Sequence, residues 1–454
     1  MNLLLPLLIA AALPVPAPPA AAALAWHDCG DAKNADVRCA MLTVPIDWAR
    51  PGRGTIELSV ARRPATDQAH KLGTLVWGPG GPWDPGADRV VNGYERFSTT
   101  IRSRFDIVGF DPRGSNGSHP VRCDPEAAGA RPAPVLTSQA DFDATLDYNR
   151  RLWAGCRSLT GPLWDHADML SNIRDVDALR AALGERQISF HGSSYGTLLG
   201  EQYAEHYPQR VRAMVLESVD DHSVPTTAAF LTSQAAAFED AFDDFAGWCD
   251  EAGAACSLNN DERGGARTVW HRLIGTHNQF DLLAVGLKRL KDADYAVLAD
   301  YLSGVDDGGP ALHITDLGVV TPAFCADWSL PVRNYAEYRA LLDKTAKIAN
   351  DTGYPPQVFA LTNCLGWRPV VNTQHPLDVH TKTPILLLNS RHDAATGLNW
   401  AKSVERQLGR HGVLVTYDGA GHGAYTLNEC MKKTADDYLV SLTVPPRGKT
   451  CPID

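Results

Sequence analysis

A serine lies at the centre of a Gly-x-Ser-x-Gly pattern at residues 192–196, and this serine is Ser194. The pattern follows an apolar stretch that predicts a strand at 187–190 and precedes a predicted helix at 197–206. A serine on such a turn presents its hydroxyl at the carboxyl edge of a sheet, where it can attack a carbonyl carbon. We therefore predict that Ser194 is a nucleophile and that the backbone N–H of Tyr195 binds the oxyanion formed by the attack.

A serine nucleophile needs a base and an acid that orients the base, and in this arrangement they follow the serine in the order Asp, His. Asp393 lies just past an apolar strand predicted at 384–388, and His422 lies in a Gly-rich turn past the strand predicted at 413–417. Because parallel strands end at the same edge of a sheet, we expect both side chains to lie beside Ser194.

Each of these assignments has a structural alternative. The serine pattern could be a chance Gly/Ser turn, Asp393 could cap a helix or a turn, and His422 could be an ordinary loop histidine. His392 and His411 compete as bases, but His392 points away from Asp393 if the two share a loop, and His411 begins a strand.

A second oxyanion donor is expected from the loop after an earlier strand. The Gly- and Pro-rich residues 78–82 follow the strand predicted at 73–77, and such a loop brings backbone N–H groups close to a substrate. We predict that Gly81 is this donor, the alternative being a plain Gly/Pro turn.

Strands alternate with helices on both sides of these motifs. Two β-prone segments at 39–44 and 55–61 predict an antiparallel start, and short apolar runs and amphipathic periods then predict a βα alternation. From residue 222 to 379 the alternation gives way to predicted helices, at 227–248, 282–302 and 335–348. We therefore predict an α/β protein in which 26–221 and 380–454 form the core and 222–379 forms an inserted helical cap domain.

Composition restricts the class of protein. Of 454 residues, 44% are hydrophobic and 21% are charged, which is typical of a globular chain with a large core. The net charge is −11 and no Lys/Arg-rich run occurs, so a nucleic-acid partner is not expected. The sequence has neither a His-Glu-x-x-His motif nor a clustered His/Cys set, and we expect no metal and no other cofactor.

The first 25 residues resemble a secretory signal peptide, with an apolar run followed by prolines and small-x-small cleavage sites, although no Lys or Arg precedes the run. No later stretch is long and apolar enough to predict a membrane span. Ten cysteines, an even number, favour disulfides in a secreted, extracellular protein. Adjacent pairing closes the shortest loops and predicts five bridges, Cys29–Cys39, Cys123–Cys156, Cys249–Cys256, Cys325–Cys364 and Cys430–Cys451.

Taken together, these motifs resemble those of the secreted α/β-hydrolase exopeptidases of actinobacteria, the tripeptidyl aminopeptidase group, which is related to the proline iminopeptidases. The matching segments are residues 78–82, 105–114, 192–197, 325–328 and 421–423, with Asp393, Cys430 and Cys451. The resemblance implies an α/β-hydrolase fold, with a mostly parallel central sheet flanked by helices. It also assigns to Ser194, Asp393 and His422 the catalytic roles derived above.

Two segments depart from the family pattern and bear on the substrate. Trp83 interrupts the small residues that the family has after the oxyanion loop, and it is either a pocket wall or a packing residue. In the second segment, Glu217-Ser218 stands where the family has Asp-Gly. Asp327, in the predicted cap domain, is our candidate anchor for a cationic amine, and its alternative is a solvated or helix-capping aspartate. Glu217 and Asp84 are the next candidates for this anchor. Asp111 and Arg113 are expected to form a structural pair that braces the oxyanion loop.

Three functions remain in competition. The first is a secreted serine aminopeptidase that releases residues or short peptides from free amino termini through an acyl-enzyme. The second is an esterase or amidase acting on a small metabolite, because one fold serves many leaving groups. The third is a binding protein on an inactive scaffold, and the complete Ser, Asp and His set argues against it.

Overall fold

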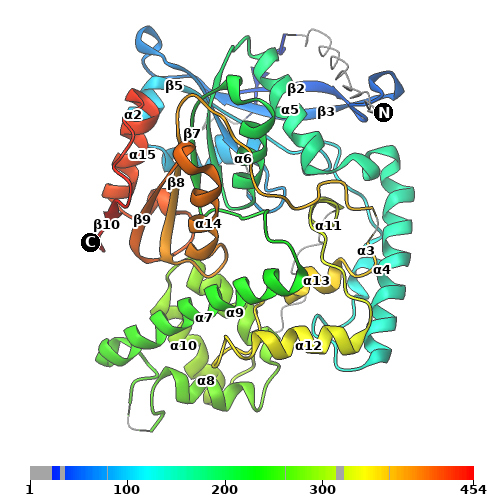
Figure 1. Cartoon of the computed structure of the whole chain (residues 1–454), viewed down its shortest axis with the longest axis vertical. Helices are drawn as coiled ribbons and strands as arrows, with labels where there is room; N and C mark the ends of the chain where they lie inside the picture. The colour runs from blue at the N-terminus through cyan, green and yellow to red at the C-terminus, as the bar shows by residue number, and fades with distance from the viewer. Residues whose placement is uncertain are drawn as a thin grey trace, which may run out of the picture.

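A 10-stranded sheet forms the centre of the molecule, in the order β1-β2-β3-β5-β4-β6-β7-β8-β9-β10 (Figure 1). The computed structural model describes residues 23–30, 36–78, 80–260, 262–312, 322–367 and 369–453. Residues 1–22 of the predicted signal peptide, and Pro79 of the predicted oxyanion loop, lie outside the described residues. The two described ends of the chain lie at opposite edges of the sheet, in β1 and β10.

The sheet begins antiparallel and continues parallel. Strands β1, β2, β3 and β5 pair antiparallel in that order, and β5, β4, β6, β7, β8, β9 and β10 pair parallel. The strands are β1 His27–Asp28, β2 Arg38–Pro45, β3 Thr55–Arg63, β4 Gly73–Gly78, β5 Phe105–Phe110, β6 Ile188–Ser193, β7 Val211–Glu217, β8 Ile385–His392, β9 Gly412–Ala420 and β10 Thr450–Cys451. The predicted α/β class with a mostly parallel sheet is therefore confirmed.

Apolar strands are buried on both faces because helices cover both faces. Along β8, Ile385 and Leu387 pack into one hydrophobic core, and Leu386 and Leu388 pack into the other. Helices α5 (Met169–Ala182), α6 (Tyr195–His206) and α14 (Leu398–Leu408) contribute to the first core. The second core is covered by α1 (Gly86–Asn92), α2 (Thr99–Arg104) and α15 (Glu429–Ser441).

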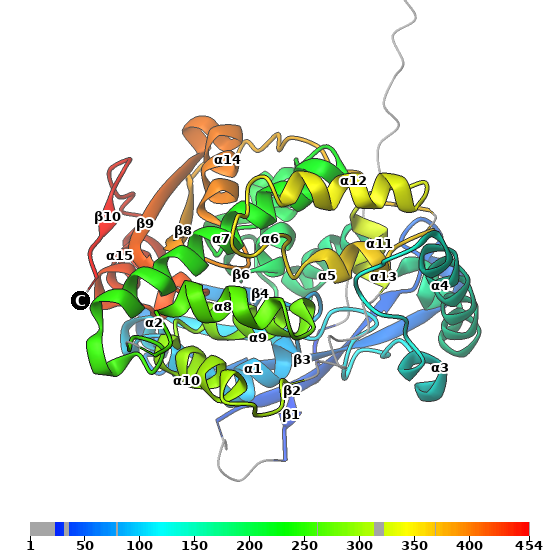
Figure 2. The ribbon, with the colours of Figure 1, turned by 90° about the horizontal axis from the view of Figure 1, so that it is seen from below.

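Between β7 and β8 the chain forms seven described helices, α7 Thr227–Glu251, α8 Ala266–Ile274, α9 Gln279–Lys291, α10 Tyr295–Asp306, α11 Pro322–Asp327, α12 Tyr335–Thr345 and α13 Val358–Asn363. Viewed from below, α7, α8, α9, α10 and α12 lie in front of the sheet (Figure 2). Helices α7 to α10 share a hydrophobic cluster that includes Phe242, Trp270, Leu283 and Leu298. We propose that 222–379 is a cap domain inserted into a core made of 26–221 and 380–454.

The structure corrects two predictions of helical segments. Residues 282–302 form two helices, α9 and α10, because the chain turns at Ala293 with a φ of +54°. Helix α4, Gln139–Thr160, follows α3, Pro125–Gly129, and was missing from the predicted elements. Its amphipathic sequence is capped by the hydroxyl of Ser138, which accepts a hydrogen bond from the backbone N–H of Asp141.

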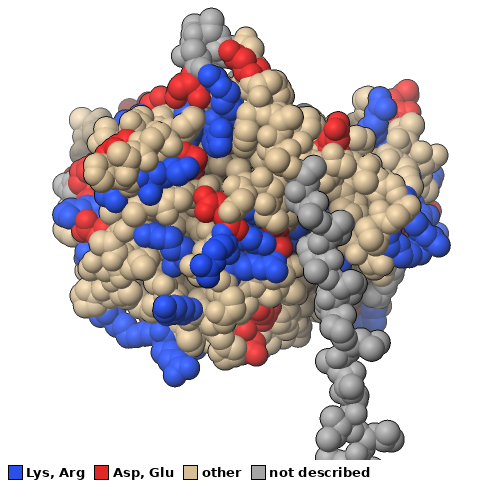
Figure 3. Space-filling model, turned by 90° about the horizontal axis from the view of Figure 1, so that it is seen from above, with Lys and Arg blue, Asp and Glu red and all other residues tan. Residues whose placement is uncertain are grey.

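The five predicted disulfides are all present, joining Cys29–Cys39, Cys123–Cys156, Cys249–Cys256, Cys325–Cys364 and Cys430–Cys451. Among the helices that the structure describes, none combines the length and apolar character that a membrane crossing requires. On the face opposite the inserted helices, basic and acidic side chains are interspersed among larger areas of other residues (Figure 3).

Candidate active site

Ser194 occupies a sharp turn between β6 and α6. Its backbone has a φ of +55° and a ψ of −129°, a conformation that is unusual for a residue with a side chain and that stores strain. The turn is tight because a Cβ atom at Gly192 would lie 2.5 Å from the carbonyl oxygen of Gly196. The backbone N–H of Ser194 donates to the carbonyl oxygen of Glu217 at 3.0 Å, which ties the turn to the end of β7.

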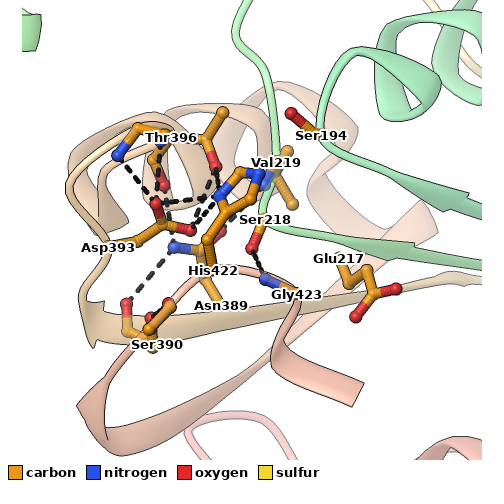
Figure 4. Close-up of polar contacts among 12 residues, drawn as sticks. Ser194, Glu217, Ser218, Val219, Asn389, Ser390, Asp393, Thr396, His422 and Gly423 are labelled. Carbon is orange, nitrogen blue, oxygen red and sulfur yellow. Dashed lines mark hydrogen bonds and ion pairs between the residues drawn. The ribbon is translucent and has the colours of Figure 1, made fainter. Parts of the chain in front are cut away.

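Asp393 and His422 lie together past the ends of β8 and β9. Nδ1 of His422 is 3.0 Å from both carboxylate oxygens of Asp393, and the hydroxyl of Thr396 donates to Asp393 at 3.1 Å. The backbone N–H groups of Ala395 and Thr396 also donate to Asp393, each at 2.9 Å. In Figure 4 the imidazole of His422 lies between Asp393 and Ser194.

These contacts determine the protonation of the pair. Burial by itself would raise the pKa of Asp393, but His422 and the hydrogen bonds from Thr396 and Ala395 hold it below its ordinary value. An ionised carboxylate can only accept hydrogen bonds, so Nδ1 of His422 carries a proton and donates to Asp393. Nε2 is then the atom that can take the proton of a nucleophile.

The turn that carries His422 is held by the end of β7. The hydroxyl of Ser218 accepts from the backbone N–H of Gly423 at 2.7 Å, and a carboxylate oxygen of Glu217 accepts from Tyr425 N at the same distance. Glu217 is fully buried and also contacts Arg96 and Nε2 of His191. Glu217 and Ser218 therefore position the His422 turn, and Glu217 is not available as a substrate anchor.

A cavity of about 350 Å³ lies beside Ser194, between the sheet edge and the inserted helices. Ser194, Tyr195 and Gly81 all line it, so the expected nucleophile and both expected oxyanion donors face one space. A Cβ atom at Gly80 would lie 3.4 Å from Cβ of Ser194, which shows how closely the Gly-rich loop approaches the serine. The other lining residues are Pro82, Asp220, Phe230, Gln234, Leu287, Lys291, Phe324, Trp328, Gln357, Phe359, Ala360, Ala395, Thr396 and Trp400.

The expected amine anchor Asp327 does not line this cavity, and the structure contradicts that role. Its side chain is fully buried and accepts hydrogen bonds from Met169 N at 3.0 Å and from the Tyr195 hydroxyl at 2.8 Å. Burial raises the pKa of Asp327 well above its ordinary value, which disfavours the ionised form that an ammonium group would need. Asp327 instead orients the aromatic side chain that follows Ser194.

Two further expectations for this region are also corrected. Trp83 packs against Ala167 and Ala323 with 6% exposure and does not line the cavity, so it is a packing residue. Asp84, the other reserve anchor, pairs with Arg89.

Asp111 and Arg113 do not pair with each other. Arg113 is fully buried and forms its ion pair with Asp175, whereas Asp111 accepts from the backbone N–H groups of Ala87 and Gly117. The competing histidines lie elsewhere, since His392 contacts Asp240 on α7 and His411 contacts the carbonyl oxygen of Thr381.

Several residues at the site were not predicted from the sequence. Thr396 lies three residues after Asp393, a spacing typical of a side chain that supports its neighbour through an Asx turn. Asp220 lies three residues past β7, the strand between those that carry Ser194 and Asp393, and this placement is the signal that could have identified it. Gln234 and Gln357 come from the inserted helical segment, and nothing in the local sequence points to them.

Comparisons with known proteins match this architecture. Residues 91–266 match the family described as alpha/beta hydrolase fold, and residues 355–451 match the family described as TAP-like protein. Tripeptidyl aminopeptidase of Streptomyces lividans is 30% identical over 476 residues, covering 95% of this chain and 87% of the relative. The chain belongs to the TAP-like family of α/β-hydrolases. The TAP-like match spans β8 and β9, and therefore includes both Asp393 and His422.

Relatives in this family carry different names. Serine protease Hip1 of Mycobacterium tuberculosis is 28% identical, with 91% of this chain and 87% of the relative covered. Carboxylesterase B of Mycobacterium tuberculosis is 30% identical, with 96% and 91% covered. This TAP-like chain is accordingly a serine hydrolase.

Proposed function

We propose that the chain is a secreted serine aminopeptidase in which Ser194 is the nucleophile, His422 the base and Asp393 the acid that orients the base. The observation that carries this proposal is the contact between His422 and Asp393 at the sheet edge where the strained turn presents Ser194. The relatives named tripeptidyl aminopeptidase and serine protease support a peptide substrate. The five disulfides support an extracellular location.

The proposed reaction has two steps. Nε2 of His422 takes the proton of Ser194 as the serine oxygen attacks the carbonyl carbon, and the imidazolium then protonates the leaving amine. Backbone N–H groups of Gly81 and Tyr195 stabilise the oxyanion that develops in each step. Water then attacks the acyl-enzyme, with His422 again acting as the base, and the acyl part of the substrate leaves as a free acid.

The nucleophile is tested by replacing Ser194 with alanine. We expect Ser194→Ala to fold normally but to lose turnover by several orders of magnitude and to lose covalent labelling by a fluorophosphonate, because no acyl-enzyme can form. Ser193→Ala is the matched control, since it removes the adjacent hydroxyl from the same motif and should retain the label. A labelled Ser194→Ala protein would contradict the assignment.

An esterase or amidase is the second candidate, and the similarity to a relative named carboxylesterase favours it. A panel of chromogenic aminoacyl and tripeptidyl anilides and short acyl esters distinguishes the two candidates. We expect the anilides with a free amino group to have the largest kcat/KM. If acyl esters are cleaved and none of the anilides is cleaved, the aminopeptidase proposal is wrong.

A further inference from the structure

The cavity beside Ser194 contains one acidic side chain among its described lining residues, Asp220. Asp220 is 6% exposed, and no described residue donates a hydrogen bond to its carboxylate or pairs with it. Two other carboxylates, Asp221 and Asp393, lie close enough to repel its charge. A buried carboxylate surrounded in this way is electrostatically unsatisfied, and a cation from outside the protein would satisfy it.

Two glutamine residues that line the cavity each have an unpaired side-chain acceptor. The side-chain carbonyl oxygens of Gln234 and Gln357 are both buried without a hydrogen-bond partner among the described residues, and both side chains line the cavity. Gln234 is 3% exposed. Leaving a buried acceptor unpaired costs free energy, so these oxygens also point to a ligand that donates hydrogen bonds.

The remaining walls are mainly apolar and include one cationic side chain, Lys291. Phe230, Phe324, Trp328 and Trp400 line the cavity and contact one another, with ring centroids 5.2 to 6.3 Å apart. Aromatic faces attract cations and also accept apolar side chains. An ammonium group has three donors and one positive charge, which matches one carboxylate and two amide oxygens.

The position of Asp220 relative to Ser194 completes the argument. Its backbone N–H donates to the hydroxyl of Thr197 at 2.8 Å, and that hydroxyl donates to the carbonyl oxygen of Ser194 at 2.7 Å. The loop after β7 is therefore fixed to the turn that carries the nucleophile. A cation held by Asp220 lies at a defined place relative to the attacking oxygen.

We propose that Asp220, with the side-chain carbonyl oxygens of Gln234 and Gln357, binds the protonated α-amino group of the substrate. This inference rests on the proposed aminopeptidase function and names the residues that recognise its free amino terminus. It replaces Asp327, which is enclosed and does not line the cavity. Asp220 is a binding residue in this account and takes no part in proton transfer at Ser194.

The test compares one anilide, alanine para-nitroanilide, with its amino-acetylated form. We expect the wild type to prefer the free amine in kcat/KM by about 10²-fold, because the amine forms a desolvated, hydrogen-bonded charge pair. Asp220→Asn should reduce the preference to within about threefold, because the free-amine substrate loses the charge that balances its ammonium group. Asp221→Asn is the matched control and should not weaken the preference, since Asp221 is bound by Ser223 and Gln407 and does not line the cavity.

The pH dependence gives a second readout that needs no variant. Burial, together with Asp221 and Asp393, raises the pKa of Asp220 to about 7, and Tyr195, Glu201 and Lys291 are the other titratable groups around it. The ratio of the two kcat/KM values should rise as Asp220 ionises with increasing pH through 7. It should fall again above about pH 8 as the substrate amine loses its proton. In Asp221→Asn the rise should move to lower pH, because one source of repulsion is gone.

The outcomes separate this inference from the function on which it rests. If Asp220→Asn retains the label at Ser194 and also retains the wild-type preference, Asp220 is not the anchor although the aminopeptidase function stands. If the wild type has the same kcat/KM for the free and the acetylated substrate, both the inference about Asp220 and the proposed aminopeptidase function are wrong. If acetyl-lysine anilide is preferred over acetyl-alanine anilide and Asp220→Asn abolishes that preference, the bound cation is a side chain and the α-amino assignment is wrong.

Discussion

At the scale of single residues, the order Ser, Asp, His along the chain led us to expect Asp393 and His422 at the same sheet edge, and the two side chains are in contact. The anchor could not be predicted in the same way. Asp327 and Asp220 are both aspartates next to predicted site segments, and only three-dimensional packing shows that the first is enclosed while the second lines the cavity. Sequence order identifies the strand end on which a residue lies but not the direction of its side chain.

The acid of the proposed triad can be tested against another Asp and His pair, Asp240 with His392. Asp393→Asn should lower kcat by about 10⁴-fold, because a neutral amide no longer holds the proton on Nδ1 of His422. Asp240→Asn removes the carboxylate that contacts His392 and should leave kcat within about twofold, since Asp240 is an exposed residue of α7. Steady-state kinetics on one anilide measure kcat for both variants. A large loss of kcat in Asp240→Asn and none in Asp393→Asn would assign the base to His392.

Glu217 gives a prediction about stability and pH. Burial opposes its charge, but Arg96, His191 and the backbone N–H of Tyr425 outweigh burial and hold the pKa of Glu217 well below 4.5. Glu217→Gln should lower the free energy of unfolding by about 3 kcal/mol at pH 7, because it leaves the charge of Arg96 without its buried partner. Below about pH 4.5 the unfolded wild type binds a proton that the folded one does not, so the wild-type advantage should shrink. Urea unfolding at pH 7, 5 and 4 measures this, and a difference that is constant with pH would contradict it.

At the scale of elements, the βα alternation around Ser194 and the strands before Asp393 and His422 were predicted to within a few residues. The strong signal comes from short apolar runs that end in glycines, because such runs are buried on both faces. The helix boundaries in the inserted segment were harder to predict, because an apolar period of three to four residues continues through Ala293 although the helix ends before it. A positive φ at a residue other than glycine is a consequence of tertiary packing that no local pattern reveals.

The disulfides differ in the length of chain that each one closes. Cys430–Cys451 spans 21 residues and fixes the C-terminal segment to α15, whereas Cys249–Cys256 spans 7 residues at the end of α7. If the bridges act by restricting the unfolded chain, replacing both cysteines of the longer loop by serine should cost about 1 kcal/mol more than the same change in the shorter loop. Chemical denaturation of the two double variants measures the difference, and a larger loss for the shorter loop would indicate that native-state strain or packing dominates instead.

At the scale of the whole molecule, the cavity is defined by its two walls. The sheet edge supplies Ser194 and Asp220, and the segment between β7 and β8 supplies Gln234, Lys291 and Trp328. Neither wall forms this cavity by itself. The sequence therefore points to the candidate catalytic residues, which follow strand ends, but not to the proposed substrate-binding residues. Catalytic residues follow strand ends of one fold, whereas the substrate wall depends on how a separate set of helices lies across that edge (Figure 2).

This arrangement predicts that the enzyme removes residues from chain ends and does not cut inside a chain. A segment in the middle of a polypeptide would have to pass through a space of about 350 Å³ that is bounded by the inserted helices, whereas an amino terminus can enter alone. Incubation with an unfolded, reduced protein should therefore yield products shortened only from the amino terminus, as detected by mass spectrometry. Acetylation of that terminus should block the reaction, and the Ser194→Ala protein controls for contaminating proteases. Internal fragments that appear with the wild type and are absent with Ser194→Ala would show that the cavity opens to accept a continuous chain, and the exopeptidase assignment would then be wrong.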